Sequence, residues 1–265
     1  MPAPTSSSDR IVEFSLTNWA EIRFHVLRLL DVDHGNPQSR FLFRGQRSST
    51  WGLTASFDRL TIDGEPDQRK SMYQKYTSAL SEDIEGGDYV EVANYLRFEK
   101  IDPSLVIEML AQHHGAPTRI LDWTASPYIA LFFALSGAGA FDPTHAPAAA
   151  LWILDSTQLT KLVGHDSCEI IRIQAAGNSR SMAQQGRFTR NKSMFADLVE
   201  MIEKSPHSKT PRTSPVLYKF IIPNDLFSEI RLDLSLMGID MVRMFPGIES
   251  ICSFHRERLI AEWRP

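Results

Sequence analysis

The feature that most constrains this chain is the stretch from residue 112 to residue 135, QHHGAPTRILDWTASPYIALFFAL. Its first half carries two histidines, an arginine, an aspartate, a tryptophan and three hydroxyl groups, and an uninterrupted apolar run over Tyr128–Leu135 follows at once. Gly115 and Pro117 end a preceding helix, and Thr118–Thr124 then has the pattern of a short extended segment.

Ser126 and Pro127 have the form of a helix N-cap followed by proline at the first helical position. The polar residues therefore crowd at a strand-to-helix junction in front of a buried helix. Such groups are costly to bury unless they bond to each other or to a ligand. The sequence predicts the functional site at this junction.

The composition is that of an ordinary globular protein. The 265 residues form one large domain or two small ones, with 43% hydrophobic and 23% charged residues. A net charge of −4 argues against broad, non-specific binding of nucleic acid, although it permits a local basic groove. No leader opens the sequence and no apolar run is long enough to span a bilayer, so a cytoplasmic protein without membrane contact is expected. Cys168 and Cys252 suit neither a metal site nor a disulfide framework.

The order of apolar patterns predicts an α+β fold, with a disordered tail over residues 1–10 and a single domain over residues 11–265. We expect a split, mostly antiparallel sheet with flanking helices. Strands are expected over residues 41–43, 118–124, 149–154, 170–173 and 217–222, and helices over residues 19–30, 66–84, 89–98, 102–113, 127–135, 195–204 and 224–237.

Arg44 follows the apolar run Phe41–Phe43, which predicts a buried strand that delivers the arginine at its end. Gly45 would let the backbone turn there, and we expect it to adopt a backbone conformation or a close approach that a Cβ atom would hinder. A buried guanidinium needs a partner. The structural interpretation pairs Arg44 with Asp122 or with a helix C-terminus, whereas the functional one makes it a binding residue for an anion. Both interpretations predict that Arg44 lies within one side-chain length of residues 118–126, in a cleft with Trp123 or Trp51 in its wall.

Other polar residues have alternative interpretations. His113 and His114 are adjacent, so on a helix their side chains diverge by about 100°, and one is expected to be structural while the other faces the cleft. Asp122 suits a general base, but it equally suits an ion-pair partner of Arg119. The sequence contains no G-x-S-x-G elbow, which excludes an ordinary serine hydrolase. Three acids could hold a divalent metal in a nuclease, namely Asp122, Asp155 and Glu169.

Two motifs carry a family resemblance. The segment HHGAPTRILDWTASPYIALFFA resembles the hallmark of the FRG domain family, and Phe43-Arg44-Gly45, followed by Gln46, matches the motif that names it. Three later segments fit less sharply, at residues 180–189, 217–223 and 237–250. The resemblance covers roughly residues 40–250, nearly the whole chain.

The order of these motifs is also similar to that of the arginine–serine–glutamate class of ADP-ribosyltransferases. That similarity implies an ADP-ribosyltransferase-like fold in which the buried arginine binds the pyrophosphate or a ribose of NAD. Hydroxyl groups would then bond the nicotinamide ribose, and Trp123 or Phe188 would stack on the nicotinamide. The implied catalytic residues are Arg44, Thr124, Ser126, Gln185 and Glu249. The implied NAD-binding residues are Arg44, Gly45, His114, Thr118, Arg119, Asp122 and Trp123.

The expected function is therefore that of an NAD-consuming ADP-ribosyltransferase, with no metal. As a toxin or anti-phage defence effector it would modify a nucleic acid or protein target, and an antitoxin or immunity partner is expected. Two alternatives stay open. One is a non-catalytic module that senses or binds an anionic ligand, and the other is the metal-dependent nuclease.

Overall fold

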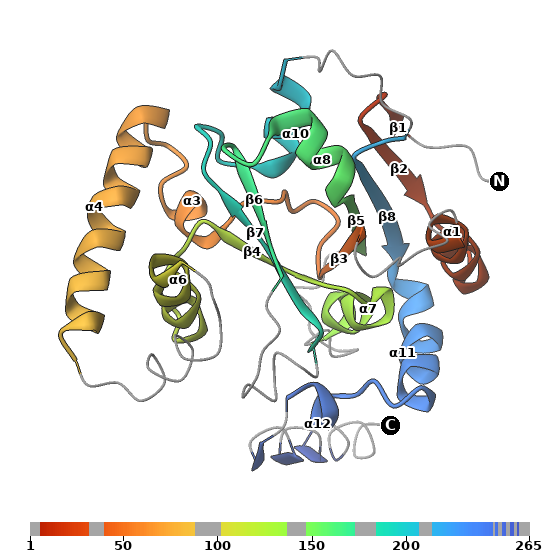
Figure 1. Ribbon diagram of the computed structural model, residues 1–265. Helices are drawn as coiled ribbons and strands as arrows, with labels where there is room; N and C mark the ends of the chain where they lie inside the picture. Colours follow the sequence, from red (N-terminus) through yellow and green to blue (C-terminus); the bar gives the residue numbers. More distant parts are fainter. Residues whose placement is uncertain are drawn as a thin grey trace.

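The computed structural model (Figure 1) describes residues 6–31, 40–87, 102–136, 147–172, 184–206, 214–245, 247–248, 251–252, 255–256 and 259. The strands are β1 (Ser6–Ser7), β2 (Ile11–Ser15), β3 (Phe41–Gln46), β4 (Ile120–Thr124), β5 (Ala148–Asp155), β6 (Cys168–Ile171), β7 (Gly186–Asn191) and β8 (Leu217–Pro223). The helices are α1 (Trp19–Asp31), α3 (Ser56–Leu60), α4 (Pro66–Glu85), α6 (Pro103–His113), α7 (Pro127–Leu135), α8 (Ser156–Val163), α10 (Leu198–Lys204), the 3-10 turn η1 (Asn224–Leu226), α11 (Phe227–Leu236) and α12 (Met241–Met244).

All the described strands belong to one mixed sheet with the order β1-β2-β8-β5-β3-β4-β7-β6. Only the pairing of β2 with β8 is parallel, and the other strand pairs are antiparallel. The expected α+β class with a mostly antiparallel sheet is therefore confirmed.

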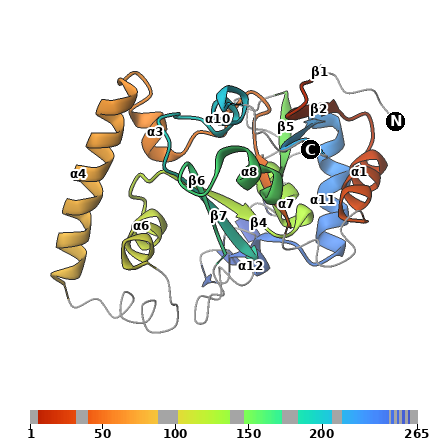
Figure 2. The same ribbon diagram turned by 45° about the horizontal axis from the view of Figure 1, so that its top comes forward.

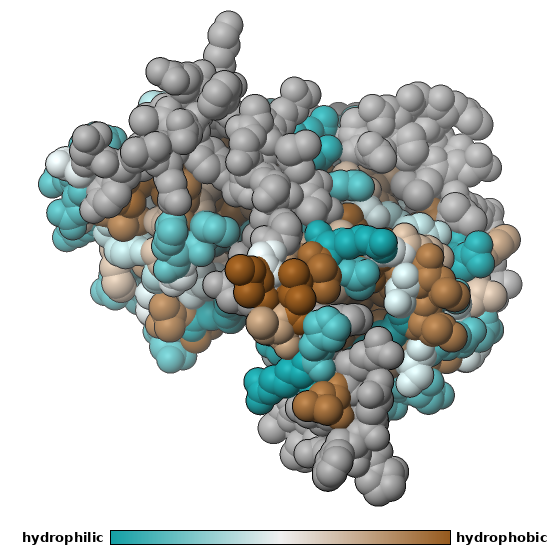
Figure 3. Space-filling view, turned by 90° about the horizontal axis from the view of Figure 1, so that it is seen from below, coloured by the Kyte–Doolittle hydropathy of each residue, from teal (hydrophilic) through white to brown (hydrophobic). Residues whose placement is uncertain are grey.

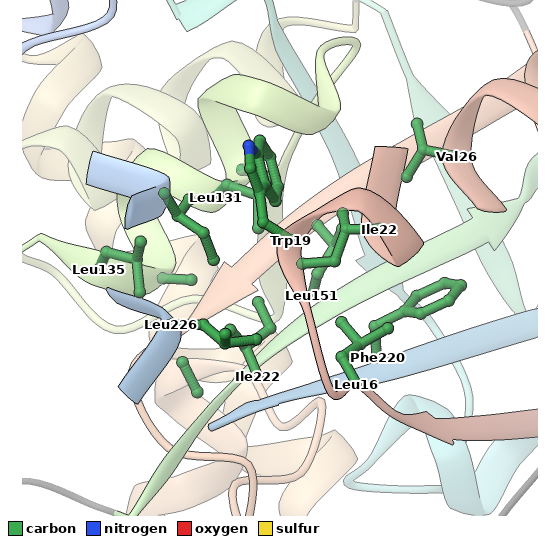
Figure 4. Close-up of a cluster of buried hydrophobic side chains, with 14 of the residues drawn as sticks. Leu16, Trp19, Ile22, Val26, Leu131, Leu135, Leu151, Phe220, Ile222 and Leu226 are labelled. Carbon is green, nitrogen blue, oxygen red and sulfur yellow. The ribbon is translucent and has the colours of Figure 1, made fainter. Parts of the chain in front are cut away.

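Two hydrophobic cores lie on opposite faces of this sheet. On one face, α1, α7 and α11 pack around Trp19, Leu131 and Ile230, and Figure 4 shows part of this cluster against Leu151 of β5 and Phe220 of β8. On the other face, α8 and α10 cover a second cluster. A third and smaller cluster holds α6 against β4 and β6. Burial on both faces explains why β5, AAALWILD, is a nearly continuous apolar run rather than an alternating one.

The helix α7 packs directly on the backbone of β3 at Gly45. A Cβ atom built at Gly45 would lie 1.8 Å from the carbonyl oxygen of Ala130 and 2.5 Å from the amide nitrogen of Ala134. The prediction that a Cβ atom at Gly45 would be hindered is therefore confirmed. The expected turn there is wrong, because β3 runs on through Gln46 and carries Arg44 within the strand rather than at its end. Glycine is required here for close approach of a helix, which a side chain would prevent.

The sheet consists of two halves that barely touch. β3 pairs with β5 over six residues, and β4 pairs with β7 over five, but β3 and β4 share only the pair Phe43–Thr124. In Figures 1 and 2, β4, β6 and β7 lie on the side of α4 and α6, whereas β5, β8 and β2 lie on the side of α1 and α11. The expected split sheet therefore corresponds to the separation of β3 from β4.

Several sequence-based expectations fail at the level of single elements. The tail predicted over residues 1–10 is not disordered throughout, because Ser6–Ser7 forms β1 and buried Arg10 donates hydrogen bonds to the carbonyls of Ile202, Glu203 and Ser205. The strand β7, GRFTRN, is absent from the strands expected above, because its residues are mostly polar. The helix predicted over 89–98 lies outside the described residues.

None of the described helices combines the length and the apolar content needed to cross a bilayer. Figure 3 views the molecule from below. On this face hydrophobic side chains gather in separate patches among hydrophilic ones rather than in one continuous surface.

Replacing Gly45 by alanine tests the contact between α7 and β3. We expect Gly45→Ala to lower the free energy of unfolding by about 3 kcal/mol or more, because the methyl group meets backbone atoms that cannot rotate away. Urea unfolding followed by circular dichroism measures the change. Gly86→Ala, at the C-terminal end of α4, is the control and should cost less than about 1 kcal/mol. Equal effects at the two positions would contradict the packing argument.

Candidate ligand-binding cleft

A cavity of about 940 Å³ opens where β3 and β4 separate. Its volume lies at the upper end of the range typical of small-molecule sites. The lining residues come from both half-sheets, from α6 and α7, and from the segment between β3 and α3. They are Phe43, Arg44, Gly45, Gln46, Arg47, Thr50, Trp51, Gly52, Thr54, Arg59, Met109, Leu110, Gln112, His113, Ile120, Asp122, Trp123, Thr124, Ala130, Phe133, Gln184, Gly186 and Phe188.

Arg44 spans the gap between the two half-sheets. Its Nη1 donates a 2.6 Å hydrogen bond to the backbone carbonyl of Asp122. The proximity of Arg44 to residues 118–126 is therefore confirmed, and both Trp51 and Trp123 line the cavity wall, as predicted. The strands β3 and β4 are not paired at Asp122, and the side chain of Arg44 supplies a hydrogen bond to β4 there.

The guanidinium of Arg44 is only partly satisfied by the protein. Its Nε is buried and has no hydrogen-bond partner among the described residues. Loss of solvent around the group lowers the pKa of Arg44 from its ordinary value; the carboxylate of Asp122 acts in the opposite direction, and Arg59 lowers the pKa further. A half-buried, incompletely bonded cation beside a second cation gains free energy from an anion placed between them.

The charges around the cavity favour an anionic ligand. Three arginines line it, Arg44, Arg47 and Arg59, whereas Asp122 is the one carboxylate among its described lining residues. Arg47 makes no ion pair with the described residues, and its guanidinium lies 5.7 Å from the ring centre of Trp51. This excess of positive charge is local, since the whole chain carries a net charge of −4.

The carboxylate of Asp122 is held by a short relay. Gln112 Nε2 donates a 2.8 Å hydrogen bond to Asp122 Oδ1, and the hydroxyl of Thr118 donates to Gln112 Oε1. Thr118 is fully buried and also accepts a hydrogen bond from the amide of Ile120. Since its hydroxyl has one proton to give, the relay fixes which end of the Gln112 amide faces Asp122. Thr118 therefore acts behind the cavity, which it does not line, rather than as a ligand-binding residue.

The two candidate hydroxyl groups in β4 and α7 both serve the backbone. Thr124 Oγ1 accepts a hydrogen bond from the amide of Ser126 at 3.1 Å, and Ser126 Oγ caps α7 by accepting from the amide of Ile129. Thr124 lines the cavity but Ser126 does not. The hydroxyl proton of Thr124 stays available to a ligand, whereas Ser126 has a structural role as the N-cap that the sequence predicted.

Aromatic side chains form much of the remaining wall. Trp123 is buried and its indole nitrogen donates to Thr189 Oγ1 at 2.9 Å, so this ring is fixed in place as part of the core. Phe133 of α7 and Phe188 of β7 also line the cavity, and the side chain of Trp51 is 50% exposed at its edge. These rings offer flat apolar surfaces close to the arginines.

Arg119 is a structural residue, and its assignment as an NAD-binding residue is wrong. Its guanidinium is buried and does not line the cavity. The Nε donates to both carboxylate oxygens of Asp58, at 2.9 and 3.1 Å, while the two terminal nitrogens donate to the carbonyls of Ser193 and Phe195. The acid that pairs with Arg119 is therefore Asp58 and not Asp122, and Asp58 lies too far along the sequence for spacing to reveal the pair.

Two further predicted site residues do not line the cavity, but the residue before each of them does. A third predicted site residue lies outside the described residues. His113 lines the cavity, whereas His114 is the exposed C-cap residue of α6. Gln184 lines the cavity and donates to the carbonyl of Met244, whereas Gln185 is exposed in a left-handed conformation with φ of 49°. Glu249 lies outside the described residues.

The acids considered for a metal nuclease are not brought together. Asp155 is fully buried, pairs with Arg40 at 2.7 Å and caps α8, while Glu169 pairs with Lys192 at 2.6 Å. Over the part of the chain that the structure describes, no group of three or more His, Cys, Asp or Glu side chains is arranged to hold a metal ion.

The two arginines near β4 can be told apart by their effect on stability. Arg119→Ala leaves the buried carboxylate of Asp58 without its partner, so we expect the free energy of unfolding to fall by about 3–5 kcal/mol. Arg44→Ala removes one hydrogen bond and a desolvated charge, and we expect a loss of no more than about 1.5 kcal/mol. Chemical unfolding of both variants measures the difference. A loss at Arg44 as large as that at Arg119 would show that Arg44 is mainly structural.

Comparison with known proteins identifies the segment that builds this cleft. The model of the FRG domain matches residues 39–143, which include β3, α6, β4 and α7. No curated protein and no solved structure matches the chain. The matched segment supplies Arg44, Gln112, Asp122 and Thr124, so the cleft lies mainly within the part of the chain that is similar to the FRG domain.

Proposed function

We propose that the cleft between the two half-sheets binds NAD and that the protein transfers ADP-ribose from it to a macromolecule. The observation that carries the proposal is Arg44, whose Nε is buried at the junction of β3 and β4 and has no hydrogen-bond partner in the described part of the chain. A diphosphate placed there would meet Arg44 and Arg59 together, and a guanidinium binds phosphate oxygens in a bidentate way. The cavity volume of about 940 Å³ leaves room for a dinucleotide.

The arrangement of the two half-sheets supports the comparison with ADP-ribosyltransferases that the motif order suggested. Arg44 on β3 and Thr124 on β4 belong to strands that meet at a single residue pair. The nicotinamide ribose would lie near this pair, within reach of the hydroxyl of Thr124. Phe188 or Phe133 would then contact the nicotinamide ring, and Trp123, whose indole is fixed by Thr189, would support the wall behind it.

Transfer of ADP-ribose replaces one bond at C1′ of the nicotinamide ribose by another. The bond between C1′ and the nicotinamide nitrogen breaks, and its electron pair stays with nicotinamide, which leaves as a neutral molecule. The positive charge that develops on the ribose needs an anion nearby. Asp122 is the carboxylate that lines the described cavity, and its hydrogen bond from Gln112 fixes its orientation. An oxygen or nitrogen of the acceptor then bonds to C1′ and releases a proton, which Asp122 can take up.

A second candidate function is a binding module without catalysis. The hydroxyls of Thr124 and Ser126 bond to backbone amides, and Asp122 accepts a hydrogen bond from Gln112, which also suits a purely structural network. Such a module would bind an anionic ligand through Arg44 but would not release nicotinamide. If the protein is instead a transferase, the macromolecule that accepts ADP-ribose would determine whether it acts as a toxin or as an anti-phage effector.

NAD binding measured by calorimetry tests the role of Arg44. Losing a charged hydrogen bond to phosphate should weaken binding about 10- to 100-fold in Arg44→Ala. Arg23→Ala removes an exposed arginine of α1 that does not line the cavity, and it should bind NAD like the wild type. If the wild type does not bind NAD, or if both variants bind it equally well, the proposed site is wrong.

The release of nicotinamide tests the role of Asp122 and distinguishes the two candidate functions. We expect Asp122→Asn to lower the rate of release at least about 100-fold while NAD binding changes less than about threefold, because the lost charge acts mainly in the transition state. Thr118→Val breaks the relay one step further away, and a smaller fall in kcat than in Asp122→Asn is expected. Wild-type protein that binds NAD without releasing nicotinamide would select the binding module.

A further inference from the structure

The segment between β3 and α3 forms an exposed, positively charged wall beside the cavity. We propose that this wall binds single-stranded nucleic acid, with an unpaired base stacked on Trp51 and a backbone phosphate held by Arg47. The role of that strand as acceptor rests on the proposed function, since the proposed chemistry needs an acceptor beside the bound NAD. The binding surface itself follows from the residues of the wall.

Trp51 is exposed although the loop that carries it is tightly held. The side chain of Trp51 is 50% exposed, and Arg47 lies over its ring at 5.7 Å. A large aromatic side chain with no other aromatic partner among the described residues leaves apolar surface in water. Bases of every type can stack on such a ring, and an arginine beside it adds attraction for a phosphate.

Hydrogen bonds on both sides fix this loop. Gln46 accepts a hydrogen bond from the indole nitrogen of Trp152 at 2.7 Å and donates to the carbonyl of Gly52 at 2.9 Å. The indole nitrogen can only donate, so the orientation of the Gln46 amide is set. On the other side, Thr54 Oγ1 bonds to Asp197 at 2.7 Å. Trp51 is therefore presented by a rigid support, which lowers the entropy lost when a base binds.

The charges of the wall suit phosphates. Arg47 is exposed and forms no ion pair with the described residues. Arg59 belongs to the neighbouring helix α3, where its Nη1 donates to the carbonyl of Thr54 at 2.7 Å, and it adds positive charge between the wall and the proposed NAD site. Two acids lie nearby, but both are engaged: Asp58 is buried against Arg119, and Asp197 accepts from Thr54 and caps α10. The wall therefore presents cations to solvent while its acids are bonded.

A single strand fits this wall better than a duplex does. Bases in a duplex stack on each other and are not available to an external ring unless they are flipped out, which costs a few kcal/mol. A protein acceptor has no general need for a stacking ring beside two arginines. The observations therefore favour a strand whose base lies on Trp51 and whose next nucleotide reaches the cavity near Arg44.

Fluorescence anisotropy with a labelled twelve-nucleotide RNA and its DNA counterpart tests the inference on the full-length protein. Both strands should bind, and Trp51→Ala should weaken binding about 5- to 150-fold, the effect of losing one stacked base. Arg47→Ala should weaken it and reduce the slope of log K against log salt by about 0.7. The matched controls are Phe24→Ala, which removes an exposed aromatic ring of α1, and Arg23→Ala, and both should bind like the wild type.

The outcomes separate this inference from the proposed function. No binding of either strand, a Trp51→Ala variant equal to Phe24→Ala, or equal affinity for duplex and single strand would overturn the nucleic-acid surface, whatever NAD does. The acceptor assignment would be overturned if label from NAD were transferred in a lysate only to proteins, so that nuclease treatment of the labelled product removed none of it. Strand binding that depends on Trp51, in a protein that releases no nicotinamide, would uphold the surface and overturn the transferase.

Discussion

The separation of β3 from β4 after a single residue pair is the constraint on which the rest of this structure depends. Both strands are fully paired on their other edges, so each sits in a stable half-sheet. Their facing edges carry backbone groups that lack strand partners, and Arg44 reaches one of them, the carbonyl of Asp122. The motif Phe43-Arg44-Gly45 thus places a cation where the antiparallel pairing of β3 with β4 would otherwise continue.

The three residues of the motif have three different physical roles. All three line the cavity, but Phe43 is buried in the core beneath α7, Arg44 supplies the charge, and Gly45 lets the backbone of α7 approach the strand. Because strand side chains alternate between faces, a single strand can serve the core and the cavity at adjacent positions. The tight contact at Gly45 also fixes how closely α7 lies on β3, and therefore where Ser126, at the start of α7, stands relative to Arg44.

Polar residues near the cleft divide into those that face it and those that build its support. The buried pair Arg119–Asp58 and the hydrogen bond from Tyr73 to Glu108 attach α3, α4 and α6 to the β4 half-sheet. Desolvation, followed by the adjacent Glu108 carboxylate, raises the pKa of Tyr73, so its hydroxyl stays protonated and keeps donating. Such buried networks stabilise a single arrangement of the lobe, which leaves Arg44, Asp122 and Gln112 to face the cavity.

The sequence by itself determined the elements with strong local signals and the stretch that carries the site. The caps at Asp102 and Ser126 mark the starts of α6 and α7, and the apolar run of β5 marks a strand buried on both faces, because these signals depend only on neighbouring residues. Tertiary structure decided which polar side chains meet. Asp58 pairs with Arg119 across 61 positions, His113 rather than His114 faces the cavity, and Thr118 acts through Gln112. Spacing along a chain fixes the direction of a side chain only within one element, whereas the gap between β3 and β4 arises from the packing of both half-sheets.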